Sequence, residues 1–365
     1  MEELGPAMVA DVESVEKQLG EMWRAASSEE HPVVRASMLN LVVACDTPED
    51  AREATRAIAL LSLNHPGRAL VVSGAREDAP SGEPLAVFVS AHCHRGPGGS
   101  LVCSEQVTLE AARASLLLVP STLLRLLVSD TPVFVWWRRA ALAPDPLWEP
   151  LARMSDRLLI DAARHAEPEK ALRDLAALAG RESWRGSPGD LAWTRLERWR
   201  EAVASFFDSP LTRRHLDGIT RVELAAGGPM GRGGTTVAAA YLAGWLAARL
   251  GWSRGAGPWT WSRRDGREVR VEVSRDGAAR TGGVGAVRID AADGKPPARF
   301  SAERISPGSE IVRLTVEIEG TCPLPATLKL GEPDDASLLC RELERTSRDP
   351  LFDAALVEAV GAAAS

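Results

Sequence analysis

The segment Met38–Ala44 (MLNLVVA) constrains the fold most strongly. It is a mostly apolar run of strand length, which is typical of a strand buried on both faces. Thr47–Asp50 follows with the features of a helix start: a capping Thr, a Pro at the first helical position and acidic residues in the first turn. Arg68–Val72 (RALVV) then predicts a second strand. This strand–helix–strand order predicts parallel pairing in a βαβ unit.

The rest of the first part continues the alternation of helices and apolar strands. An N-terminal helix is expected over 9–26, because Val9, Val12, Val15 and Leu19 fall on one face. Segments 84–94 and 100–107 predict a hairpin around the turn at Gly96–Gly99. We further expect helices over 108–128, 145–154 and 167–179, and strands over 132–137 and 157–161.

A second part begins after the Gly-, Pro- and Ser-rich stretch 181–190. From 258 to 330, short alternating segments separated by Asp-Gly, Gly-Gly and Pro-Gly predict an antiparallel sheet. Around it we expect helices over 193–207, 235–250, 335–346 and 350–362, and a strand over 220–224.

The predicted fold is therefore an α/β N-terminal part followed by an α+β C-terminal part. The first has an open, mostly parallel sheet with helices on both faces, and the second has an antiparallel sheet with helices on one face. The predicted domains are an N-terminal helical segment (1–30), an α/β domain (31–185) and an α+β domain (186–365).

Charge and composition exclude several classes of function. The net charge of −7, with 43 basic and 50 acidic residues, does not fit a nucleic-acid-binding protein. No apolar run approaches the roughly 20 residues that span a bilayer. The N-terminus is acidic and lacks the features of a signal peptide, and the five cysteines are scattered. We therefore expect a cytoplasmic protein that binds neither nucleic acid nor membrane.

Familiar catalytic motifs are missing from the sequence. Ala44–Thr47, after the first apolar strand, lacks the glycines of a dinucleotide-binding turn. The Gly-rich segment Gly227–Thr236 lacks the Lys of a phosphate-binding loop, so it is either an ordinary connection or an anion site using Arg232. No nucleophile–base pair can be named. The sequence therefore predicts no catalytic residues, no cofactor and no metal.

Cys93 and Cys103 form a candidate thiol pair. A hairpin symmetric about Gly98 places them opposite each other on one face, where they could form a reversible disulfide. His92 and His94 would then point to the other face, which disfavours a single metal site built from all of these side chains. The alternatives are two small buried residues in a sheet, a thiol switch and a metal site.

Clusters of Trp, Arg and Asp are the most unusual motifs in the chain. They are DTPVFVWWR (130–138), DRLLID (156–161) and GDLAWTRL (189–196), the last followed by Trp199-Arg200. Trp193, Leu196 and Trp199 lie on one helix face, so they form either core or an interface of the aromatic and Arg type. Arg138, directly after a strand, is either an anion clamp or a solvated strand end. The candidate partner-binding residues are Trp137, Arg138, Asp190, Trp193, Arg195 and Trp199.

These motifs resemble those of the OpcA family, the glucose-6-phosphate dehydrogenase assembly proteins. The similarity continues in HPGR (65–68), CSEQV (103–107), LAGWLA (242–247) and Leu338–Arg348, and it covers about 31–360. The resemblance implies a bacterial, non-catalytic protein that binds glucose-6-phosphate dehydrogenase and promotes its active oligomer. It would thereby act on the oxidative pentose phosphate pathway and on NADPH supply.

Two other hypotheses remain beside this one. The first is a sensor that binds a sugar phosphate or nucleotide at Gly227–Thr236 without a dehydrogenase partner. The second is an enzyme that the motifs do not reveal. Binding of metabolites by the isolated chain would favour the sensor, and turnover by the isolated chain would favour the enzyme.

Overall fold

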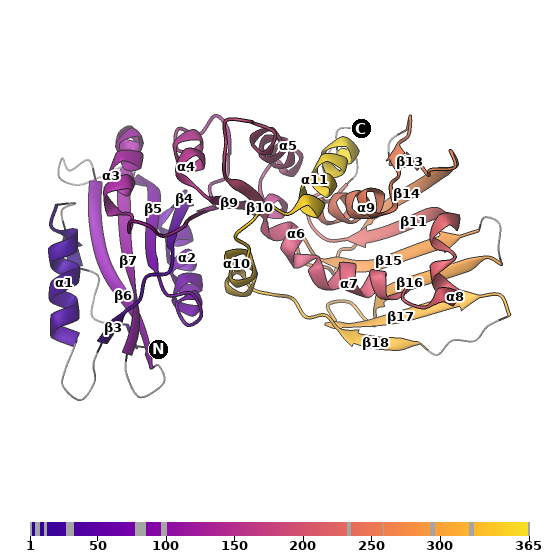
Figure 1. Ribbon diagram of the computed structural model, residues 1–365, viewed down its shortest axis with the longest axis horizontal. Coiled ribbons are helices and arrows are strands. Elements are labelled where there is room, and N and C mark those ends of the chain that lie inside the picture. Colours follow the sequence, from indigo (N-terminus) through magenta and orange to yellow (C-terminus); the bar gives the residue numbers. More distant parts are fainter. Residues whose placement is uncertain are drawn as a thin grey trace. The chain divides into compact units, whose positions relative to one another are not determined.

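The computed structural model describes residues 2–3, 8–10, 13–26, 33–76, 85–95, 101–231, 235–257, 259–292, 296–320 and 325–363. The chain forms two compact units. The first unit comprises 1–160, 182–189 and 334–347, and the second comprises 161–181, 190–333 and 348–365. Each unit is built around one sheet, and Figure 1 shows the helices and strands with their labels.

The first sheet has the strand order β1-β6-β7-β5-β4-β8-β9-β10, with β2 also paired to β6 and β3 to β7. Its strands are β1 (Glu2–Glu3), β2 (Met8–Ala10), β3 (Val33–Arg35), β4 (Asn40–Cys45), β5 (Arg68–Arg76), β6 (Leu85–Arg95), β7 (Leu101–Ala112), β8 (Val133–Trp137), β9 (Arg157–Ile160) and β10 (Ser187–Asp190).

The centre of this sheet is parallel, as the sequence predicts. Strand β4 pairs in parallel with both β5 and β8, and β8 pairs in parallel with β9. All six residues of β4 are buried, because helices cover both faces of a parallel sheet. Figure 1 shows α1 (Val15–Ala26) and α2 (Pro48–Leu61) on opposite sides of the sheet. The other helical elements of this unit are η2 (Arg113–Leu118), α3 (Val119–Leu126), α4 (Trp148–Met154) and α10 (Asp335–Leu343).

Helix α10 comes from the far end of the chain and is held to the first unit by buried charges. The Arg157 guanidinium on β9 donates to the Glu342 carboxylate on α10 with an Nη2–Oε2 distance of 2.6 Å. Both side chains are almost fully buried, so removing the Glu342 carboxylate would leave the Arg157 charge buried without it. Together with the packing of α10 against α2, this pair ties residues 334–347 to the first unit.

Two helix predictions for the first part are wrong in extent. Residues 8–10 form strand β2, paired with β6, so the first helix begins only at Val15. Residues 108–112 extend strand β7, where Leu109 and Ala111 are buried and alternate with Thr108 and Glu110. This period of two is that of a strand with one buried face. Pairing within the sheet thus outweighs the helix propensity of Leu and Ala in this segment.

The second sheet has the order β12-β13-β14-β11-β15-β16-β17-β18. Its strands are β11 (Ile219–Ala226), β12 (Ser253–Arg254), β13 (Thr260–Ser262), β14 (Glu268–Arg275), β15 (Val284–Ala291), β16 (Ala298–Arg304), β17 (Ile311–Ile318) and β18 (Ala326–Lys329). The sheet is mostly antiparallel, as predicted, but it is not a simple meander. Strand β11 lies between β14 and β15 and runs parallel to β14.

Helices pack over one face of the second sheet, and Figure 1 shows α7 (Glu197–Ser205) and α9 (Val237–Leu250) in front of it. Residues on the opposite face are exposed, as Glu268, Arg270 and Glu272 show on β14. The other helical elements of this unit are η3 (Ala162–Arg164), α5 (Pro168–Ala179), α6 (Leu191–Arg195), α8 (Pro210–Arg213), η4 (Leu216–Gly218) and α11 (Pro350–Ala363).

The two units do not coincide with the predicted domains, which meet at 185/186. The chain passes into the second unit at Asp161 and returns to the first for residues 182–189. Strand β10 adds to the edge of the first sheet beside β9, so the Gly- and Pro-rich stretch that suggested a linker contributes to a sheet instead.

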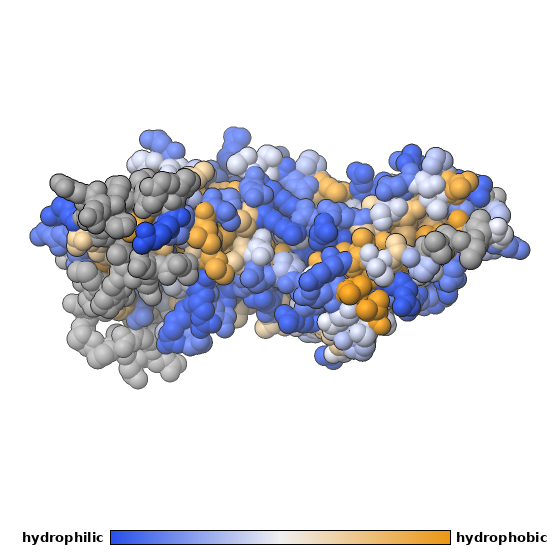
Figure 2. All heavy atoms as spheres, turned by 90° about the horizontal axis from the view of Figure 1, so that it is seen from below, coloured by the Kyte–Doolittle hydropathy of each residue, from blue (hydrophilic) through white to orange (hydrophobic). Residues whose placement is uncertain are grey.

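Apolar residues are scattered on the exterior. None of the described helices is both long and apolar enough to cross a bilayer. Among the coloured residues of Figure 2, hydrophilic ones predominate and apolar ones form small separate patches. Single exposed side chains such as Leu211 and Leu328 are normal on a protein surface.

The contact between α9 and α11 yields a prediction about stability. A Cβ on Gly244 would lie 2.5 Å from the Ala355 carbonyl oxygen, whereas a Cβ on Gly361 would meet nothing closer than 3.6 Å. We expect Gly244→Ala to lower the free energy of unfolding by about 1–3 kcal/mol through overpacking. Gly361→Ala, the matched control, should leave it unchanged or raise it slightly. Urea denaturation measures both, and equal effects would contradict this packing.

Candidate functional site

Asp190 lies at the centre of the GDLAWTRL motif. It is fully buried and caps helix α6, accepting a hydrogen bond from the Ala192 backbone N–H at 2.8 Å. Its carboxylate also accepts from the Ala162 backbone N–H at 3.1 Å and from the Tyr241 hydroxyl at 2.7 Å. One side chain thus joins η3, α6 and α9, three elements that are far apart in the sequence.

The environment of Asp190 shifts its ionisation. Burial raises the pKa of Asp190 to about 7, and the negative charge of Asp161 adds to this rise. The hydrogen bonds from Tyr241, Ala192 and Ala162 oppose it, because they stabilise the charged form. Asp190 can therefore exchange a proton near neutral pH, but its full burial makes it a structural group and not an accessible base.

Trp193 is packed between aromatic and cationic side chains. Its ring lies 5.6 Å from that of Tyr241 and 5.7 Å from that of Phe352, between centroids. The Arg200 guanidinium stacks 3.5 Å from the ring centroid, and its Nη1 donates to the Trp193 carbonyl oxygen at 2.7 Å. Because Trp193 is only 2% exposed, the structure places it in the core.

Arg195 and Trp199 lie at the border of the same cluster. The Arg195 guanidinium donates two hydrogen bonds to the Asp161 carboxylate, at 2.7 and 3.3 Å, in a bidentate pair. Trp199 is 4% exposed, and the Arg304 guanidinium lies 5.8 Å from its ring centroid. The structure therefore brings Asp190, Trp193, Arg195 and Trp199 together within the second unit.

The candidates of the first unit form a separate, largely internal cluster. Trp137 is buried against Trp148, with ring centroids 5.0 Å apart, and its neighbour Trp136 is equally buried. Arg138 pairs with Asp50 and Glu53 of α2 and with Asp335 of α10. Of the predicted alternatives for Arg138, the structure therefore shows a clamp for carboxylates of its own chain.

Cys93 and Cys103 lie opposite each other in the β6–β7 hairpin, which confirms the predicted register. They are joined by a disulfide and are fully buried. On the other face, His92 Nε2 lies 3.1 Å from Gln106 Oε1, so this ring has a hydrogen-bonding partner within the sheet. The turn at 96–100 lies outside the described residues.

The Gly-rich segment 227–236 begins at Gly227, which lies close to the backbone of residues 279–280. A Cβ on Gly227 would lie 2.3 Å from the carbonyl oxygens of Ala279 and Arg280, so this position requires glycine. Thr236 at the other end caps α9 by accepting a hydrogen bond from the Ala239 N–H at 3.3 Å. Arg232 and its two following residues lie outside the described residues. The predicted anion site there stays a prediction.

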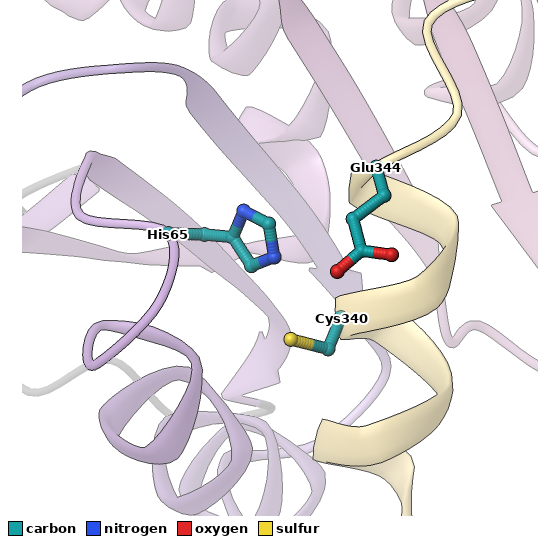
Figure 3. Close-up of side chains that lie close together, drawn as sticks. All are labelled: His65, Cys340 and Glu344. Carbon is teal, nitrogen blue, oxygen red and sulfur yellow. The ribbon is translucent and has the colours of Figure 1, made fainter.

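One cluster has metal-ligand chemistry that the sequence did not reveal. His65, Cys340 and Glu344 point toward one another in Figure 3, with ligand atoms within 4.8 Å of one another. Glu344, the C-cap residue of α10, follows Cys340 by four residues. His65 Nε2 is buried without a hydrogen-bond partner among the described residues. Ligands of one tetrahedral zinc lie roughly 3.6 Å apart, since each is about 2.0–2.3 Å from the ion. The cluster therefore offers three donors of the kinds that bind zinc, at separations of up to 4.8 Å.

The partners of the motif residues are not evident from the sequence. Tyr241 and Arg304 come from segments far from the motif, and nothing in their local sequence connects them to Asp190 or Trp199. The single Tyr of the chain, in an apolar helix, was the available signal, because a buried Tyr hydroxyl usually finds a hydrogen-bond partner.

The fold and these clusters define a protein with an α/β unit and an α+β unit, whose Trp, Arg and Asp motifs pack within each unit. Residues 59–177 match the model of the glucose-6-phosphate dehydrogenase subunit N-terminal domain, and residues 187–356 match that of its C-terminal domain. The chain belongs to this OpcA family. The resemblance stated from the motifs is thereby confirmed.

Two cyanobacterial relatives carry the name of this family. An OxPP cycle protein OpcA of Nostoc punctiforme is 27% identical over 75% of this chain, but the chain spans only 61% of its length. The OpcA of a Synechocystis strain is 24% identical across 96% of this chain and 77% of that relative. Among solved structures, an aldose-aldose oxidoreductase from Caulobacter crescentus is 12% identical, with a TM-score of 0.42 over 89% of this chain and 97% of that one.

The pKa of Asp190 generates a prediction about pH-dependent stability. The folded-state pKa of about 7 exceeds the ordinary value of 3.8, so the folded protein holds a proton that the unfolded chain releases. The stabilisation from this proton is fully present below about pH 4 and is lost as pH rises through about 7. Over that range the free energy of unfolding falls by at most about 1.4 kcal/mol per pH unit. In the Asp190→Asn variant this loss should be absent, because the amide does not titrate.

Urea denaturation at pH 5, 6, 7 and 8 measures this difference between the wild-type protein and the variant. Tyr241→Phe is a second variant: it removes a hydrogen bond that lowers the pKa of Asp190, so the loss should move to higher pH. Parallel stability profiles for the wild-type and Asp190→Asn proteins would contradict the assigned ionisation.

Proposed function

We propose that this chain is a non-catalytic regulatory partner of glucose-6-phosphate dehydrogenase in the bacterial cytoplasm. It binds the dehydrogenase and promotes its active oligomer, and it thereby increases NADPH supply through the oxidative pentose phosphate pathway. The observation that carries this proposal is the family match, which extends through both structural units under descriptions that name a subunit of this dehydrogenase.

The start of helix α2 supports a non-catalytic role. In open α/β sheets that bind dinucleotides, the pyrophosphate sits at the N-terminus of the helix after the first strand, where glycines allow close approach. Here the turn after β4 carries the carboxylates of Asp46, Glu49 and Asp50. These negative charges would repel a pyrophosphate, and Pro48 and Thr47 stand where the glycines would be needed.

The intramolecular contacts of the motif residues also support a regulatory role over a catalytic one. Asp190 is sealed in the core as a helix cap, and Arg138 is committed to three carboxylates of its own chain. These two side chains stabilise the folds of the two units.

The effect on the dehydrogenase itself is the direct prediction. Adding the purified chain to glucose-6-phosphate dehydrogenase of the same organism should raise NADPH formation at subsaturating glucose 6-phosphate, and the effect should saturate as more chain is added. Initial rates followed by NADPH absorbance measure it. An equal mass of an unrelated acidic protein controls for nonspecific stabilisation.

The chain alone, given glucose 6-phosphate and NADP⁺, should form no NADPH above the rate of the buffer. Turnover by the isolated chain would contradict the non-catalytic role. Dehydrogenase kinetics that stay the same at every chain concentration would contradict the regulatory role.

A further inference from the structure

A cavity in the second unit has a lining rich in arginine. It is formed by residues from η3, the α6–α7 junction, the turn at 280–283, the end of β16 and the segment 331–333. Its volume is about 260 Å³. Arg195 and Trp199 of the GDLAWTRL region line it, so the motif that identifies the family also forms a wall of this cavity.

The charge of the lining is strongly positive. Four guanidinium groups line the cavity, and Glu332 is the one carboxylate among the lining residues. Asp161, which is not among the lining residues, pairs with Arg195 and Arg164. Glu332 pairs with Arg280 and Arg304. Among the residues that line this small volume, arginine side chains thus outnumber carboxylates. The four cations are Arg164, Arg195, Arg280 and Arg304.

Two of these guanidinium groups are held in place before any ligand arrives. The Arg304 side chain is 5% exposed and donates to the Val284 carbonyl oxygen at 2.7 Å, as well as to Glu332 at 3.1 Å. Arg195 is fixed by its bidentate pair with Asp161. Fixed donors bind an anion with less loss of side-chain entropy than mobile surface arginines.

The backbone of the 280–283 turn is shaped around Arg195. Gly282 has a φ of +76°, and a Cβ there would lie 2.8 Å from Arg195 Nη1. The 280–283 turn packs closely against Gly227, whose N–H donates to the Gly283 carbonyl oxygen at 3.0 Å. Both glycines therefore serve the geometry of the cavity, which gives the start of the Gly-rich segment a structural reason.

We propose that this cavity binds a small phosphate ester. A phosphate monoester carries about −1.5 to −2 charges at pH 7, and the guanidinium groups of the lining carry the complementary charge. Guanidinium groups recognise phosphate oxygens through paired, charge-assisted hydrogen bonds. The volume lies just below the roughly 300–1,000 Å³ typical of drug-sized ligands, which fits a monophosphate of one small sugar and not a dinucleotide.

The indole of Trp199 supplies an apolar wall for the uncharged part of such an ester. This site lies beyond the proposed dehydrogenase partnership and does not rest on it, because the isolated chain suffices to test it. Failure of the ligand site would leave the partnership untouched, and failure of the partnership would leave the ligand site untouched.

Isothermal titration calorimetry of the full chain tests the proposal, with a hexose monophosphate, the unphosphorylated hexose and inorganic phosphate as probes. The hexose monophosphate should bind saturably at one site per chain and more weakly as salt increases, and the free hexose should not bind. Binding of inorganic phosphate without binding of the ester, or no saturable binding of either, overturns the proposal.

A matched pair of variants locates the binding. Arg280→Gln removes a cavity guanidinium that is 83% exposed, and Arg270→Gln removes one that is 65% exposed on β14, outside the cavity. Both positions are exposed enough for the variants to fold. We expect Arg280→Gln to weaken binding of the hexose monophosphate about tenfold or more, and Arg270→Gln to leave it unchanged. Equal weakening by both, or no weakening by Arg280→Gln, contradicts the assigned site.

Discussion

The buried carboxylate of Asp190 is the interaction on which the second unit most depends. It accepts hydrogen bonds from η3, from the first turn of α6 and from Tyr241 on α9, so it fixes where α6 begins. The start of α6 in turn places Trp193 against Tyr241 and Phe352 and directs Arg195 to Asp161. Burial without these three donors would be very costly, because an isolated carboxylate is strongly disfavoured in a protein interior.

Much of the fold follows from patterns visible in the sequence, because those patterns act locally. Three elements show this: β4 is predicted by its apolar run, α2 by the Thr47 cap with Pro48, and α9 by its strongly apolar composition. Segment 108–112 was misassigned because its composition favours a helix, while pairing with β5 and β6 makes it a strand. The insertion of β11 between β14 and β15, and the return of α10 to the first unit, depend on contacts between distant segments. No local pattern encodes these contacts.

The candidate residues could be recognised from the sequence, but their roles could not. GDLAWTRL with Trp199 identifies the family, yet only the structure separates core residues such as Trp193 from cavity residues such as Arg195 and Trp199. Arg304, Gly282 and Glu332 complete that cavity from segments that carry no motif. Such convergence is set by tertiary packing. The same holds for His65, Cys340 and Glu344, which lie close together although the sequence separates His65 from the other two.

We propose that this chain acts by binding a dehydrogenase and promoting its active oligomer. Sedimentation velocity of the dehydrogenase, alone and with increasing amounts of the chain, tests it most directly. The account predicts a faster-sedimenting species that contains both proteins and grows until the chain saturates it, at the expense of the free dehydrogenase. Two boundaries that keep their separate sedimentation coefficients at every ratio, at concentrations well above those used in activity assays, would contradict it.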